Sequence, residues 1–157
     1  MFNGYKYVET RENFGMIVKH YQYIENPKMR ALLFHSKTGC DDIYKLLFTY
    51  NDMVHNPIGP ARITFFKANG SNNYTITGYN YFLNSYLCDK DTCNILRKLA
   101  TADDSEIIYK KMLDNQYDIS IDDIKICRTI AQQFNLKNNL DFFESIIIIN
   151  ELEGNNV

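Results

Sequence analysis

The chain has 157 residues, of which 45% are hydrophobic and 23% charged, and it contains only three prolines. This composition excludes an intrinsically disordered chain and suits a single domain covering residues 1–157, because a core of this size removes about two-thirds of the unfolded surface from water. The formal net charge of −2 argues against a general attraction to nucleic acid or to an anionic membrane, so we expect neither as a partner.

The N-terminal sequence lacks a basic flank followed by an apolar run, and therefore shows no signal peptide. The most apolar run, 146–149, is far too short to span a bilayer. We therefore expect a cytoplasmic protein. Abundant Asn, Ile, Tyr and Lys with little Gly and Pro suggest an AT-rich genome, such as that of a virus, a phage or a low-GC bacterium. For a viral protein the expected location is the host cytoplasm.

The first half of the chain predicts mostly helices. A short strand over 4–9 is followed by a helix from about Glu12, which ends at Asn26-Pro27 because the residue before proline avoids the α region. Residues 29–34 fit either a short helix or a buried strand. A clearer helix is expected over 41–55, where apolar residues recur at i, i+3, i+4 and i+7, and Asp41 and Asp42 complement the helix dipole in its first turn.

A β-hairpin is the best-defined element. Residues 61–66 alternate in the manner of a strand, 69–73 (NGSNN) supply residues that tolerate a positive φ, and a second strand rich in Tyr, Thr and Ile follows from Tyr74. The aromatic side chains of this hairpin either belong to the hydrophobic core or form a binding surface, and the sequence is compatible with both.

The second half predicts helices. One passes through Cys93, Leu96 and Leu99, and 105–113 is either a helix capped by Asp104 or a strand. The sequence from Ser120 to Asp123 resembles a capping box that opens a strong helix over 121–134, and a last helix through 142–147 ends near Gly154. Together these elements predict an α+β fold, with an antiparallel sheet centred on a hairpin at about 61–82 and packed by several amphipathic helices.

No pattern for catalysis, for a metal or for a cofactor emerges. The three histidines, His20, His35 and His55, are not spaced as metal ligands, and the four scattered cysteines are best explained as reduced, small, buried side chains. Each acidic pair sits at an expected helix start, where capping explains it. No glycine-rich phosphate loop is present. We therefore expect a protein that is not an enzyme and that holds neither a metal nor a cofactor.

One order of elements resembles a GAF domain. The expected helix over 41–55 leads through Gly59-Pro60-Ala61-Arg62 into the strand at 63–66, and the late helix contains Ile130-Ala131-Gln132-Gln133-Phe134. The turn 66–70 (FKANG) is also similar to that of short GAF-like phage proteins, with Ala68 where those proteins have histidine.

The resemblance implies a non-catalytic regulatory module that binds a small ligand or forms a homodimer. It implies a pocket between the sheet and the segment after the hairpin. The residues expected to line it are Phe66, Asn69, Tyr79, Tyr81, Asn84 and Tyr86. The alternative for the aromatic residues is that they belong to the core or form cross-strand pairs. The alternative function is a viral or phage-type interaction protein that binds and modulates a host protein through its helical surface.

Overall fold

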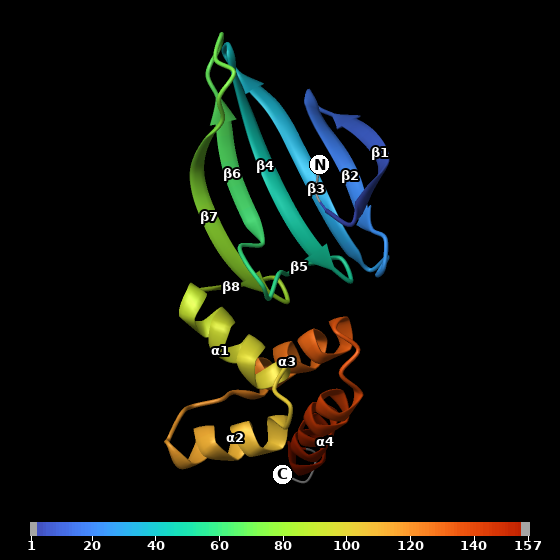
Figure 1. The fold of residues 1–157 in the computed structure, drawn as a ribbon, viewed down its shortest axis with the longest axis vertical. Coiled ribbons are helices and arrows are strands. Elements are labelled where there is room, and N and C mark those ends of the chain that lie inside the picture. Colours follow the sequence, from blue (N-terminus) through green and yellow to red (C-terminus); the bar gives the residue numbers. More distant parts are fainter. Residues whose placement is uncertain (1–2, 155–157) are drawn as a thin grey trace. The chain divides into compact units, whose positions relative to one another are not determined.

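The computed structural model describes residues 3–154 and divides the chain into two compact units, residues 1–89 and residues 90–157. In residues 3–154 the secondary-structure elements of the first unit are all strands and those of the second unit are all helices (Figure 1). The predicted α+β class and its antiparallel sheet are therefore confirmed. The prediction of a single domain over 1–157 stays a prediction, and each unit is described by itself.

The sheet unit is one antiparallel sheet of eight strands in the described residues. Its order is β1-β2-β3-β4-β6-β7-β8, with the short β5 paired to β4, so that neighbours in sequence are mostly neighbours in the sheet. The strands are β1 (Tyr5–Asn13), β2 (Met16–Tyr23), β3 (Met29–Thr38), β4 (Asp41–Tyr50), β5 (Met53–Val54), β6 (Arg62–Lys67), β7 (Thr75–Leu83) and β8 (Tyr86–Cys88).

Tight turns join these strands. Phe14 and Gly15 have φ values of 49° and 76° between β1 and β2, and Gly39 has a φ of 66° between β3 and β4. Two pairs, Asn51-Asp52 and Asn84-Ser85, have positive φ at both residues, as a type I′ turn requires. Because such turns match the twist of the flanking strands, they fix the register of β4 with β5 and of β7 with β8.

Two predicted helices are wrong. The segment from Glu12 to Asn26 contains the end of β1, a turn and β2, and the segment 41–55 contains β4 and β5. Asp41 and Asp42 therefore begin a strand and do not cap a helix. Both faces of this sheet carry apolar side chains, so that adjacent residues such as Leu46 and Leu47 are both apolar. The alternation of apolar and polar residues that is expected for a strand with one buried face is therefore missing from the sequence.

The predicted hairpin is confirmed as β6 and β7, which pair from Arg62↔Asn80 to Phe66↔Thr75. Thr77 forms a bulge in β7, since Thr64 pairs with Gly78 and Phe65 with Ile76. The hairpin lies toward one end of the strand order, because β1 to β4 precede it and β3 and β4 lie in the middle of the sheet. The short strand predicted over 4–9 is present within β1, and of the two alternatives for 29–34 the structure has the strand.

The helical unit consists of α1 (Lys90–Ala100), α2 (Ser105–Asp114), α3 (Ile121–Gln133) and α4 (Lys137–Gly154). The helices predicted through Cys93, over 121–134 and through 142–147 are confirmed, and of the two alternatives for 105–113 the structure has the helix. Asp104 caps α2 by accepting a hydrogen bond from the Ile107 N–H. The capping box is also confirmed, because Ser120 and Asp123 each accept the other's backbone N–H. Fully buried apolar side chains include Leu99, Ile130 and Phe143. Among the described helices, none is long and apolar enough to cross a membrane.

Candidate functional site

The sheet is a single layer within its unit. All elements in the described residues up to 89 are strands of this one sheet, so neither a helix nor a second sheet of the unit covers its faces. A sheet with an apolar face usually packs that face against another layer, because exposure of apolar side chains to water costs free energy. The two faces are therefore the natural places to look for a binding surface, and the strand register assigns each side chain to one of them.

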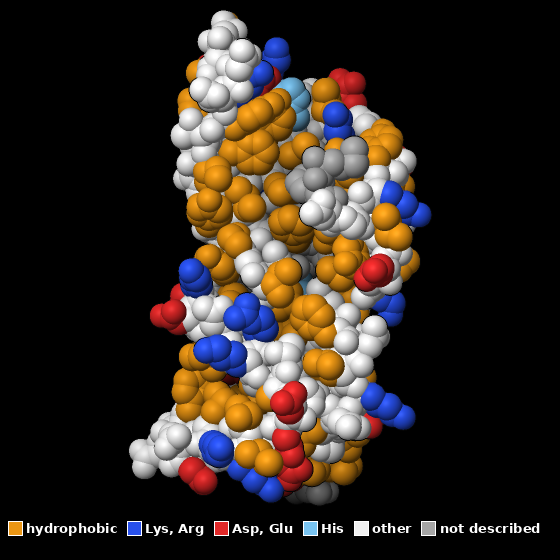
Figure 2. All heavy atoms as spheres, in the orientation of Figure 1, with side chains coloured by type: hydrophobic (Ala, Val, Ile, Leu, Met, Phe, Trp, Pro, Cys, Tyr) orange, Lys and Arg blue, Asp and Glu red, His pale blue; other side chains and the backbone are white. Residues whose placement is uncertain are grey.

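The first face, called the aromatic face below, collects rings from five strands. Side chains directly opposite one another share a face, so Tyr7, Tyr21, Ala31 and Phe48 form one row across β1 to β4. Further rings lie on the same face, namely Tyr5, Tyr23, His35, Tyr44, Tyr50 and Phe65. In the view of Figure 2, hydrophobic side chains gather over β3, β4 and β6.

A ladder of stacked rings crosses the aromatic face. The rings of His35 and Tyr44 stack at 4.5 Å and those of Tyr44 and Phe65 at 5.1 Å, each with an interplanar angle of 7°. Tyr74 packs edge-on against both Tyr44 and Phe65. Because His35, Tyr44 and Phe65 turn their flat faces to one another, these three rings leave few flat faces on which a nucleobase could stack. This geometry disfavours single-stranded nucleic acid on the aromatic face.

A hydrogen bond between His35 and Asp42 lies at the end of this ladder. The Nε2 of His35 lies 2.7 Å from the Oδ1 of Asp42. The hydrogen bond from His35 holds the pKa of the Asp42 carboxyl below its ordinary value, and Lys37 and Lys67 lower it further. Burial raises the pKa of the Tyr44 hydroxyl, and Tyr74 and Asp42 raise it further. The imidazole of His35 is thus held between a carboxylate and an aromatic ring, which fixes its orientation in the ladder.

The opposite face, called the basic face below, carries cations from four strands. The register places Arg11 beside Val18 and Phe34, and Arg30 beside Gln22 and Thr49. The cations of this face are Lys6, Arg11, Arg30, Lys45 and Arg62, with His20 among them, whereas the carboxylates on it are Glu9 and Asp41. The sheet unit as a whole has nine Lys and Arg against seven Asp and Glu, whereas residues 90–157 have eight against twelve.

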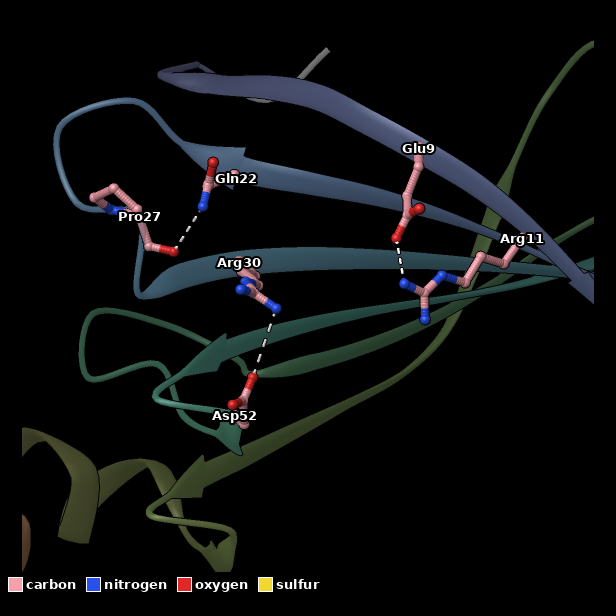
Figure 3. Close-up of polar contacts among 6 residues, drawn as sticks. All are labelled: Glu9, Arg11, Gln22, Pro27, Arg30 and Asp52. Atoms are coloured by element: carbon pink, nitrogen blue, oxygen red, sulfur yellow. Dashed lines mark hydrogen bonds and ion pairs between the residues drawn. The ribbon is translucent and has the colours of Figure 1, made fainter.

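A hollow of about 230 Å³ lies at the basic end of this face, lined by Val8, Glu9, Arg11, His20, Tyr21, Gln22 and Arg30. Figure 3 shows its polar contacts: Arg11 pairs with Glu9 at 2.6 Å, and Arg30 pairs with Asp52 at 3.7 Å. The Gln22 amide donates a hydrogen bond to the Pro27 carbonyl. The side chains of Arg11 and Arg30 are 68% and 50% exposed, so both guanidinium groups can exchange these partners for other carboxylates.

A second hollow on the same face is apolar. It has a volume of about 250 Å³ and is lined by Met16, Phe34, Ser36, Ile43, Lys45 and Leu47. Val18 and Leu32 lie on the same face between this hollow and the basic one, by the register of β2 with β3. The basic face thus carries two adjoining hollows, one lined by Arg11, His20 and Arg30 and the other lined mainly by apolar side chains together with Lys45.

The six residues predicted to line a pocket do not come together on one face. Phe66 lies on the basic face, opposite Ile43, whereas Tyr79 lies on the aromatic face, opposite Ile63, and is 53% exposed. Tyr81 pairs with Cys88, and Tyr86 begins β8 with 63% exposure. Their role in ligand binding stays a prediction.

The two asparagines of that set lie in turns. The Asn69 N–H donates to the Oδ1 of Asp41 at 3.1 Å, which ties the β6–β7 turn to β4. The Asn84 N–H donates to the Nδ1 of His55 at 3.0 Å. His55 is only 2% exposed, so this bond holds the β7–β8 turn against the segment after β5. Both bonds use the backbone N–H and do not require an asparagine side chain, whereas the positive φ of 49° at Asn84 is one that asparagine tolerates well.

The cysteines differ in exposure. Cys93 and Cys127 are buried as predicted, whereas Cys40 is exposed in the β3–β4 turn, which corrects the prediction of a buried thiol there. All four are free thiols. Burial raises the pKa of the Cys127 thiol well above its ordinary value, and Asp123 adds to this effect. In the described residues, no group of three or more His, Cys, Asp or Glu side chains could hold a metal ion.

We expect an aromatic disulfide reagent such as Ellman's reagent to modify Cys40 rapidly in the native protein and to leave Cys93 and Cys127 unmodified until the chain unfolds. The reason is that the thiolate is the reactive form and that burial disfavours it. The time course of absorbance at 412 nm measures this, and a Cys40→Ser variant should lose the fast phase. Rapid modification of Cys127 in native protein would contradict the buried position of its thiol.

Sequence reasoning missed the basic face because its cations are scattered along four strands that were partly predicted as helices. The Tyr5-Lys6-Tyr7 segment was the available signal, since in a strand it places Lys6 on one face and both tyrosines on the other. On the helical unit, α4 exposes Ile148, Ile149 and Leu152. Binding of a host protein through the helical surface stays a prediction.

Comparison of the chain with protein-family models, curated proteins and solved structures finds no match in any of the three.

Proposed function

We propose that this chain is a non-catalytic binding module that holds an acidic and partly apolar segment of another protein on the basic face of its sheet. The observation that supports this most directly is the pair of hollows on one face, one holding Arg11 and Arg30 and the other lined by Phe34, Ile43 and Leu47. A partner segment with carboxylates at one end and apolar side chains at the other fits both.

The arginines favour carboxylates as the charged groups of the partner. Arg11 and Arg30 already pair with Glu9 and Asp52 on the surface, where such ion pairs contribute about 0–1 kcal/mol. Exchange for a partner's carboxylates therefore costs little. A guanidinium group also accepts a carboxylate in bidentate geometry, which gives direction as well as charge.

Protein is a better fit than nucleic acid for this face. Single-stranded nucleic acid needs aromatic side chains on which successive bases stack, and the tyrosines of the sheet lie mainly on the aromatic face. The ring of Phe82 is covered by the guanidinium of Arg62, whose carbon lies 5.3 Å from the ring centroid. The aliphatic and half-buried side chains between the cations suit apolar residues of a polypeptide.

The test uses the full chain and a fluorescein-labelled 12-residue peptide in which Glu residues occupy one half and Leu and Phe the other. We expect an increase in anisotropy that weakens with added salt, because Coulomb attraction is screened. A peptide with Gln in place of Glu should bind at least about tenfold more weakly, since each charge-assisted contact contributes on the order of 1 kcal/mol.

The decisive variant is Arg11→Glu/Arg30→Glu, which we expect to lose binding at least tenfold. Its matched control is Lys19→Glu/Lys37→Glu, which makes the same change in net charge with two exposed lysines of the aromatic face and should bind normally. An equal loss in both variants would show attraction to net charge alone and would refute the proposed surface. Tight binding of a single-stranded DNA oligonucleotide with no binding of the peptide would make this a nucleic-acid surface instead.

A further inference from the structure

One edge of the sheet is open along most of a strand. β8 pairs with β7 only at Tyr81, Phe82 and Leu83, so in the described residues the stretch 75–80 has no strand on its outer side (Figure 1). An edge strand presents a row of N–H and C=O groups that another strand can bind. This edge is separate from both faces of the sheet.

The two edges of the sheet differ in charge. The opposite edge strand, β1, carries Lys6, Glu9, Arg11 and Glu12, together with a bulge at Val8, and charges on an edge strand oppose pairing with another chain. The open stretch of β7 reads Thr-Ile-Thr-Gly-Tyr-Asn and contains no charged residue. Its Ile76 and Tyr79 are 52% and 53% exposed. The edge of β7 therefore lacks the protection that β1 has, apart from its own bulge at Thr77.

We propose that β7 of one copy of this chain pairs in antiparallel fashion with β7 of a second copy, which forms a two-fold symmetric dimer with a continuous sheet. A two-fold axis perpendicular to a strand necessarily brings identical strands together in antiparallel orientation. Because the stretch 75–80 is uncharged, such pairing buries no charged side chain and places no like charges opposite each other.

The register follows from the faces of the side chains. Ile76 and Tyr79 both lie on the aromatic face, opposite Phe65 and Ile63 of β6, whereas Thr75 and Asn80 both lie on the basic face. Directly opposite residues of an antiparallel pair share a face. The register that satisfies this in both copies places Ile76 opposite Tyr79 of the second copy, and Thr75 opposite its Asn80. In this register the two Thr77 bulges lie next to the two-fold axis. Each bulge adds one residue, which shifts the alternation of side chains between the faces, and the bulge of the second copy makes the same shift in the opposite direction along the pair.

The dimer should be weak. A stretch of this length spans about 20 Å of strand, and the contact falls below the roughly 1,200 Å² typical of stable interfaces. We expect a dissociation constant in the range of about 10–500 µM. This inference does not rest on the proposed function, since neither Arg11 and Arg30 nor the two hollows of the basic face take part in the pairing.

Sedimentation velocity of the full chain from about 5 to 500 µM, with a reducing agent to prevent disulfides through Cys40, tests this. We expect a reversible monomer–dimer equilibrium. Ile76→Lys should weaken it at least tenfold, because it adds a charge to the paired strand. The matched control is Val8→Lys, which places the same charge on the other edge at a residue that is 51% exposed, and it should leave the equilibrium unchanged.

A compensating variant tests the register. In Ile76→Lys/Tyr79→Glu each lysine would lie opposite a glutamate of the second copy, so we expect the dimer to return at least to the strength of the unchanged chain. Far-UV circular dichroism of every variant should match that of the unchanged chain, since both side chains are exposed. A chain that remains monomeric up to 500 µM would overturn the proposal, as would an equal effect of Val8→Lys. Failure of the double variant to dimerise would refute the stated register.

Discussion

Replacement of Phe143 by alanine is expected to lower the free energy of unfolding of the helical unit by about 3–5 kcal/mol. The Phe143 side chain is 0% exposed, and its ring centroid lies 5.4 Å from that of Phe142. Removal of a buried ring loses its transfer free energy and leaves a cavity that neighbouring helices fill only in part. For a unit of this size the loss corresponds to a decrease in Tm of roughly 15 °C or more.

The measurement is urea denaturation followed by circular dichroism at 222 nm, which reports the helices of residues 90–157. Phe134→Ala serves as the matched control, because that ring is 39% exposed, and it should cost about 1 kcal/mol or less. Phe143→Leu keeps most of the volume and should cost less than about 2 kcal/mol. Equal losses for Phe143→Ala and Phe134→Ala would mean that Phe143 is not the centre of this core.

The helices of the second half were predictable because local signals agree with one another. The capping box of Ser120 and Asp123 indicates the start of α3, and the buried residues Ile124, Cys127 and Ile130 follow at helical spacing. In α1, α3 and α4 buried residues recur at helical spacing, so that the period of 3.6 survives in the sequence, whereas α2 buries only Ser105.

The strands of the first half were harder to predict because both faces of their sheet carry apolar side chains. A strand with one buried face shows alternation, whereas in β4 the adjacent residues Leu46, Leu47 and Phe48 are all apolar. Ile43, Leu46, Leu47 and Tyr50 then happen to match the helical spacing. β-branched and aromatic residues at Ile43, Tyr44 and Thr49 were the contrary signal, and they favour a strand.

The binding surfaces could not be found from local sequence for a related reason. Arg11, Arg30 and Lys45 become neighbours only through the register of β1 to β4, and that register depends on hairpins which were not predicted. The part of the GAF-like resemblance that rested on a helix over 41–55 is lost with that helix, while the strand at 63–66 and the helix at 121–134 are both present. The resemblance itself stays a prediction.

The second large effect is expected at Asn139, which is 7% exposed near the start of α4. Its Nδ2 donates to the Ala100 carbonyl at 2.9 Å and to the Ala102 carbonyl at 2.8 Å. Ala100 ends α1, where the carbonyls of a helix have no partner within the helix, so that this amide caps α1 from another helix. Asn139→Ala removes both bonds and should cost about 2–3 kcal/mol, because buried acceptors are left without a donor.

Asn139→Asp separates the lost bonds from lost packing, because it keeps the shape and replaces the donor by a carboxylate. At pH 7 that carboxylate would face two carbonyl oxygens, with Asp103 and Asp104 nearby, so we expect it to destabilise the unit more than alanine does. The same surroundings raise the pKa of the new carboxyl in the folded state above its unfolded value. The charge-dependent part of the destabilisation is therefore absent below the unfolded pKa of about 4 and grows as the pH rises through the folded-state value, while the loss of one of the two hydrogen bonds remains at every pH. Urea denaturation of the variant and of the unchanged chain at pH 4, 5.5 and 7 measures this, and we expect the difference between their free energies of unfolding to widen with pH. A difference that is the same at all three pH values would mean that Asn139 does not cap α1.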